Sequence, residues 1–87
     1  MNTNKNYILR KIAGEAVLVP TGTAARQING MINMTPVAAY IWEHMPACQD
    51  EEEMIELVLK EYEVEEEIAR RDVYGFINML REQGMAE

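Results

Sequence analysis

Ala25–Met45 has the sequence ARQINGMINMTPVAAYIWEHM, and this stretch changes from extended backbone to helix halfway along. The change falls at Thr35 and Pro36. A Thr hydroxyl can accept a hydrogen bond from an unpaired amide of a first helical turn, and Pro needs no amide partner there. The next apolar residues recur at helical spacing: Val37, Tyr40, Ile41 and Met45. The pattern therefore predicts a helix over Pro36–Met45, with Trp42 as its core anchor because a buried indole removes a large apolar area from water.

The residues before this helix predict a small antiparallel sheet. Apolar and polar residues alternate over Tyr7–Ala13, and a second β-prone run follows at Ala16–Val19. Gly14 lies between these runs and can supply the positive φ that a tight turn needs, so the two runs predict a hairpin. A third strand is expected within Ala25–Ile32, bent or bulged near Gly30.

The residues after the first helix predict two more helices. The second covers Glu51–Tyr62, with Asp50 as its N-cap. The third covers Glu65–Gln83 and ends at Gly84. On a helical wheel the third helix has an inner apolar stripe, with one band on each side of it. The stripe is Ala69, Val73, Phe76 and Leu80, with Asp72 and Met79 on one side, and Ile77 and then Arg70, Tyr74 and Arg81 on the other.

The element order β-β-β-α-α-α predicts a small α+β domain of winged-helix character, with a three-stranded antiparallel sheet followed by three helices. The chain has 87 residues, which is the length of one domain. We expect residues 1–6 to be flexible and residues 7–87 to form that single domain. A sheet this small has an edge whose backbone donors and acceptors can pair with another peptide.

The charge of the chain argues against binding to a nucleic acid. The net charge is −7, from 15 acidic and 8 basic residues, whereas sequence-independent binding to phosphates needs clustered Lys and Arg. The alternative function is a winged-helix DNA-binding regulator, which would need a basic recognition helix. The predicted third helix instead begins with three glutamates, and its cations are Arg70, Arg71 and Arg81.

The sequence lacks the motifs of the common catalytic and metal sites. It has no Gly-rich phosphate loop. The one histidine, His44, and the one cysteine, Cys48, are too few ligands for a structural zinc site. We therefore expect no enzyme activity, no metal and no cofactor. A single cysteine and the absence of a long apolar run favour a cytoplasmic protein that does not enter a membrane.

Three stretches of the chain resemble one known family. They are YILRKIAGEAVLVP at Tyr7–Pro20, INGMINMTPVAAYIW at Ile28–Trp42 and YEVEEEIARRDVYGFINMLREQGM at Tyr62–Met85. In this series the chain resembles the coenzyme PQQ synthesis protein D (PqqD-like) family, whose members are also called RiPP recognition elements. The resemblance covers nearly the whole domain from Tyr7 onward.

The resemblance implies a fold of three strands packed on three helices, and a binding function without catalysis. Such proteins bind the leader segment of a ribosomally made precursor peptide. They present it to a modifying enzyme, commonly a radical S-adenosylmethionine (radical SAM) maturase. The leader adds as a strand beside the third strand, in a groove whose other wall is the third helix. The pathway, quinone cofactor synthesis or another peptide modification, stays open, as does the choice between a monomer and a weak homodimer.

The resemblance places the groove between roughly Arg26–Asn29 and one flank of Glu65–Gln83, and the candidate binding residues are chosen there. On the third strand these are Arg26, Gln27, Ile28 and Asn29, and on the third helix Arg70, Val73, Tyr74 and Ile77. For Val73 and Ile77 the alternative is plain core packing. For Arg70 it is an ion pair with Glu66, four residues earlier on the helix.

Overall fold

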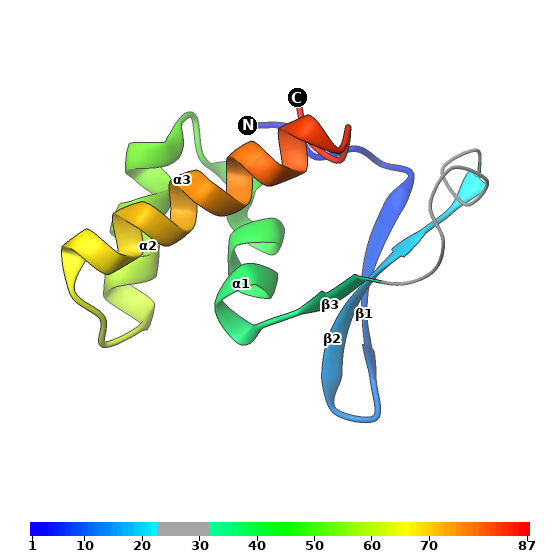
Figure 1. Cartoon of the computed structure of the whole chain (residues 1–87), viewed down its shortest axis with the longest axis horizontal. Coiled ribbons are helices and arrows are strands. Elements are labelled where there is room, and N and C mark those ends of the chain that lie inside the picture. The colour runs from blue at the N-terminus through cyan, green and yellow to red at the C-terminus, as the bar shows by residue number, and fades with distance from the viewer. Residues whose placement is uncertain (23–31) are drawn as a thin grey trace.

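A three-stranded sheet comes first in the chain and a group of helices follows it (Figure 1). The computed structural model describes residues 1–22 and 32–87. The predicted α+β class and element order are confirmed. The elements are β1 (Tyr7–Ile12), β2 (Glu15–Pro20), β3 (Ile32–Met34), α1 (Pro36–His44), the short 3-10 helix η2 (Met45–Ala47), α2 (Glu51–Glu61) and α3 (Glu66–Glu82).

The hairpin of β1 and β2 forms because its two turn residues adopt positive φ. Ala13 has φ 53° and Gly14 has φ 82°, and two successive positive φ angles give a turn whose twist matches that of the strands. The antiparallel register runs from Tyr7 opposite Pro20 to Ile12 opposite Glu15. The predicted hairpin is therefore confirmed.

The third strand lies at one edge of the sheet. The strand order is β1-β2-β3, and β3 pairs antiparallel with β2 from Ile32 opposite Leu18 to Met34 opposite Ala16. Within the residues that the structure describes, no other strand pairs with β3. The third strand was predicted within Ala25–Ile32. The described strand covers Ile32–Met34 and ends directly before the N-cap Thr35. It shares Ile32 with the predicted range, and the rest of that range, residues 25–31, lies outside the described part.

The three α-helices begin and end within one residue of their predicted bounds, and the expected capping residues set three of these ends. The Thr35 hydroxyl accepts a hydrogen bond from the Ala38 amide at 3.1 Å. The Asp50 carboxylate accepts one from the Glu53 amide at 3.0 Å. Gly84 follows α3 with φ 74°, a left-handed conformation that ends a helix at little cost for glycine. The two hydrogen bonds fix where α1 and α2 begin, and the backbone of Gly84 fixes where α3 ends.

The core lies between the inner face of the sheet and the three helices. Leu18 and Ile41 are almost fully buried there, and Trp42 is buried as predicted. The buried stripe of α3 is made of Ala69, Val73, Ile77 and Leu80. Phe76, predicted in that stripe, is only partly buried, and Ile77 takes its place. The centre of the buried face is thus rotated toward Ile77.

The two ends of the chain lie side by side (Figure 1). The Asn4 amide donates to the Met85 carbonyl at 2.8 Å, and Thr3 forms an antiparallel bridge with Ala86. Residues 1–6, predicted to be flexible, thus include backbone contacts to the C-terminal end, and their mobility stays a prediction. Among the described residues, no helix combines the length and the apolar character that crossing a membrane requires.

Candidate functional site

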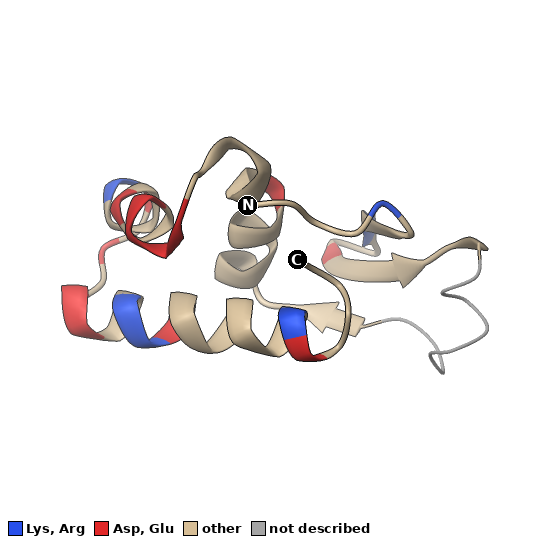
Figure 2. Ribbon diagram, turned by 90° about the horizontal axis from the view of Figure 1, so that it is seen from above, with Lys and Arg blue, Asp and Glu red and all other residues tan. Residues whose placement is uncertain are grey.

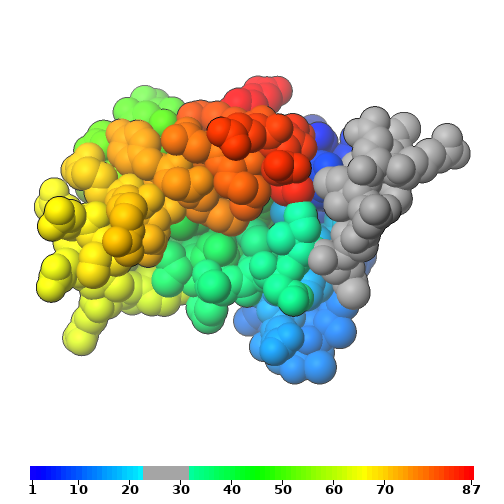
Figure 3. Space-filling view, viewed as in Figure 1, coloured from blue at the N-terminus to red at the C-terminus, as the bar shows by residue number. Residues whose placement is uncertain are grey.

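A groove of about 550 Å³ lies between the edge strand β3 and helix α3. In Figure 3, α3 is orange and lies above β3 and the start of α1, which are blue-green. Three elements line the groove. β3 and the residue after it contribute Ile32, Asn33, Met34 and Thr35, α1 contributes Val37, Ala38 and Ile41, and α3 contributes Arg71, Asp72, Gly75, Phe76 and Met79.

The floor of the groove is apolar because of how α1 begins. The Thr35 cap starts α1 directly after β3, so the first turns of the helix lie beside the end of the strand. Val37 and Ala38 are half-buried there, and Ile41 behind them is buried. A ligand in the groove would meet methyl groups rather than charges on this side.

The α3 wall of the groove is apolar in its middle and charged toward the helix N-terminus. Phe76 and Met79 are half-buried and flank the core stripe on the side of β3. One to two turns earlier, Arg71 Nε lies 3.5 Å from Asp72 Oδ1, with both side chains largely exposed. Figure 2 shows the uncharged middle of α3 between charged turns at its two ends.

The four predicted α3 residues lie on other faces of the helix. Val73 and Ile77 are fully buried in the core, which is the alternative reading of the sequence for both. Arg70 and Tyr74 lie on the side of α2. None of the four is among the described residues that line the groove, and their part in binding stays a prediction.

Glu52 of α2 holds Arg70 and Tyr74. Arg70 Nη1 donates to Glu52 Oε2 at 2.6 Å, and the Tyr74 hydroxyl donates to the same oxygen at 2.7 Å. Arg70 also contacts Glu66 at 3.5 Å, the predicted pair within the helix. The bonds from Arg70 and then Tyr74 lower the pKa of the Glu52 carboxyl. The bond to Glu52 in turn raises the pKa of Tyr74.

The predicted strand residues Arg26, Gln27, Ile28 and Asn29 lie outside the described residues. The described part of β3 has its own candidates, Ile32 and Asn33, which line the groove. Phe76 and Met79 were seen in the sequence as members of the α3 stripe and of one flank. A helical-wheel projection of α3 could have identified Phe76 and Met79 as groove residues only if the flank that faces the sheet had been known.

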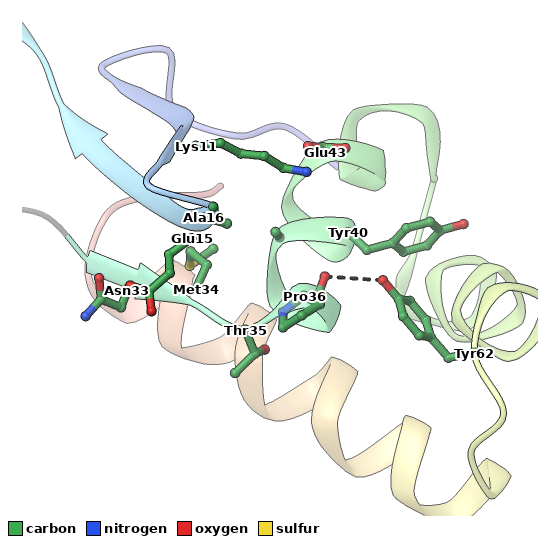
Figure 4. Close-up of a pocket in the computed structure, with 12 residues that line it drawn as sticks. Lys11, Glu15, Ala16, Asn33, Met34, Thr35, Pro36, Tyr40, Glu43 and Tyr62 are labelled. Carbon is green, nitrogen blue, oxygen red and sulfur yellow. Dashed lines mark hydrogen bonds between the residues drawn. The ribbon is translucent and has the colours of Figure 1, made fainter.

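A second hollow, of about 570 Å³, lies on the other side of α1 (Figure 4). It is lined by residues of the β1–β2 hairpin, of β3 and of α1, and by Tyr62 after α2. The Tyr62 hydroxyl donates to the Pro36 carbonyl at 3.3 Å, and its ring meets the Tyr40 ring edge-on at 5.5 Å. The helix α3 does not line this hollow, whereas it forms one wall of the first groove.

The one cysteine and the one histidine pack against neighbouring side chains. Cys48 is buried, its thiol contacts Met54 sulfur at 3.9 Å, and burial raises the pKa of the thiol. A raised pKa keeps the thiol protonated and unreactive near neutral pH. His44 packs on Tyr40, with ring centroids 4.2 Å apart. Within the described part of the chain, no cluster of potential metal ligands is present.

The comparisons with known proteins give one family match and two solved structures with the same fold. The sequence pattern described as coenzyme PQQ synthesis protein D (PqqD) matches residues 15–86. A solved structure described as TbiB1 in complex with the TbiA(beta) leader peptide has 22% sequence identity and a TM-score of 0.74, covering 100% of this chain and 95% of that one. A lasso peptide synthetase B1 complexed with the leader peptide has 22% identity and a TM-score of 0.75, covering 99% and 95%. No curated protein sequence matches the chain.

Proposed function

The chain belongs to the coenzyme PQQ synthesis protein D (PqqD) family, and from this premise we propose that it binds the leader segment of a ribosomally made precursor peptide. The leader adds as a fourth strand on the outer edge of β3, in the groove between β3 and α3. The observation that carries the proposal is the combination of a strand edge left open by the described residues with an apolar groove directly beside it.

The strand edge supplies binding that tolerates many sequences. An extended peptide that pairs with β3 satisfies backbone groups on both chains, whatever its side chains are. β3 has three residues, Ile32–Met34, so the edge alone offers few hydrogen bonds. The groove must therefore supply much of the affinity and the choice among peptides.

The groove supplies that choice through alternate side chains of the guest strand. Successive side chains of a strand point to opposite faces of a sheet. Every second side chain of the leader would point toward Ile41, Phe76 and Met79, and the others would point away from α3. We therefore expect a leader with apolar residues at positions i and i+2. Because ordering a flexible leader costs free energy, we expect a dissociation constant in about the micromolar to submicromolar range.

Two proteins that share this fold were solved with leader peptides bound. That supports the assignment of a leader peptide, rather than DNA, as the ligand here. In the cell, this chain would present the leader to a peptide-modifying enzyme, such as a radical SAM maturase, and would itself perform no catalysis. This work would take place in the cytoplasm, where precursor peptides are made.

The direct test is to titrate the isotope-labelled protein with the synthetic leader of the precursor peptide encoded beside its gene. We expect the largest amide shifts at Ile32–Thr35 and at Arg71–Met79. A scrambled peptide of the same composition is the control and should cause small, scattered shifts. Shifts confined to α2 would contradict the assignment of the groove.

A further inference from the structure

The glycine at position 75 differs from the other glycines that the structure describes. Gly14, Gly22 and Gly84 have positive φ, a backbone conformation that favours glycine because other residues have a Cβ. Gly75 lies in the middle of α3 with ordinary helical backbone. The conformation of the backbone therefore does not explain this glycine.

Packing within the protein does not explain it either. Apart from the adjoining residues and the backbone of its own helix, a Cβ built on Gly75 would meet no described atom within 4 Å, so alanine would fit without any shift. Glycine is a poorer residue than alanine inside a helix, because it loses more backbone freedom on folding. The helix would thus be more stable with a side chain at this position, and the fold alone gives no reason for its absence.

The position of Gly75 suggests the reason. It lies on the groove wall between Arg71 on one side and Phe76 and Met79 on the other. Without a side chain, the wall has a recess in which a guest can approach the helix backbone. Residues that violate a local preference without a structural gain are commonly found at functional sites.

We propose that Gly75 sets the size of the leader side chain that the groove accepts. The recess takes one large apolar side chain, aromatic or branched, from the leader strand paired with β3, and this inference rests on the proposed function. A strand added to β3 would lie about 4.8 Å from it, with alternate side chains facing α3. Phe76 and Met79 supply the apolar surface beside the recess.

The test fills the recess with a small and then a large side chain. Binding is measured for each variant with one probe, a fluorescein-labelled form of the synthetic leader proposed above. Gly75→Ala should raise the melting temperature by about 3–6 °C, because helix propensity improves. It should weaken leader binding about tenfold, because the added methyl group overlaps the guest side chain. Gly75→Leu should abolish measurable binding while the protein stays folded.

A matched control lies on the same helix. Asn78 is exposed and is not among the groove-lining residues, so Asn78→Ala should also improve helix propensity but leave binding unchanged. An alanine scan of the leader completes the test. One truncation of a large apolar residue should weaken binding to the wild type strongly, and the same truncation should have little effect on Gly75→Ala.

The outcomes separate this inference from the proposed function. If the wild type binds the leader and both Gly75 variants bind it equally well, the role of Gly75 is wrong and the proposed function stands. If the wild type binds no leader, the proposed function fails and this inference fails with it. Weakened binding to both Asn78→Ala and Gly75→Ala would also overturn the inference, because the effect would then follow helix stability rather than the recess.

Discussion

Two faces of the same helix, α3, have opposite relations to the rest of the protein. On the face toward α2, Arg70 and Tyr74 share the carboxylate of Glu52 at 2.6 and 2.7 Å. On the face toward β3, Phe76 and Met79 line a groove instead of entering the core. The first face has its polar groups paired within the protein, and the second has apolar surface left without a covering element among the described residues.

A bound peptide can gain more binding energy on the apolar face of α3 than on the face toward α2. Donors that already bond a carboxylate must lose that bond before they can pair with a ligand, so the net gain is small. Half-buried apolar groups beside an open strand edge gain by losing contact with water. A charged face near a groove is therefore a weaker sign of a peptide site than a plain apolar face, although the charged residues stand out more in the sequence.

The largest expected effect comes from the stripe between the two faces. Ile77 is fully buried, so Ile77→Ala should reduce the free energy of unfolding by about 2–5 kcal/mol through lost contacts and a cavity. Chemical denaturation measures this. The folded variant should bind the leader about as well as the wild type, because Ile77 does not line the groove. A variant with unchanged stability and lost binding would place Ile77 in the site instead of the core.

The next effect should appear in binding alone. Met79→Glu places a charge on the apolar part of the groove, where a bound leader would desolvate it without a partner. We expect leader affinity to fall about 100-fold, with little loss of stability because the side chain is only half-buried. Met79→Leu is the control, and isothermal titration calorimetry is the measurement. Equal affinities of Met79→Glu and Met79→Leu would remove this wall from the binding site.

The smallest effect concerns the face toward α2. Glu52→Gln removes the charge that holds Arg70 and Tyr74, and leader affinity at pH 7 should stay within about twofold of the wild type. The bonds lower the pKa of Glu52 below its ordinary value of 4.5. Its contribution to stability is therefore complete above that value and is lost as the pH falls through the lowered pKa.

Thermal unfolding between pH 7 and pH 3 measures this contribution. The gap in melting temperature between the wild type and Glu52→Gln should narrow as the pH falls. A gap that stays constant across this range would show that the ionised carboxylate of Glu52 does not stabilise the protein, and a large loss of leader affinity would assign this face to binding.

Much of the fold could be predicted from the sequence because local chemistry specifies it. Thr35-Pro36 and Asp50 begin helices through their own side chains, and Gly84 ends one through its φ. The alternation of β1 and the turn glycine predicted the hairpin. The predicted third strand ended at Ile32, whereas the described strand continues to Met34, because a short edge strand directly before a helix cap has little sequence pattern to mark its end.

The face of α3 that forms the groove could not be predicted in the same way. The helical period predicts the buried stripe, but the sequence of a single helix does not show which flank of that stripe faces the sheet. Which flank faces β3 depends on how α3 crosses the sheet and α1, and that is set by tertiary packing. Arg70 and Tyr74 were predicted as groove residues, but both bond Glu52, which lies on another helix. That contact cannot be seen in the sequence of α3 alone.

The central claim is that a leader peptide pairs as a strand with the open edge of β3. A scan with leader peptides that are N-methylated at one backbone position each tests it most directly, because N-methylation removes one backbone donor and leaves the side chains unchanged. We predict that methylation at alternate positions of the central segment prevents binding and that methylation at the positions between has little effect. Uniform tolerance along the leader, or sensitivity without this period of two, would contradict strand addition.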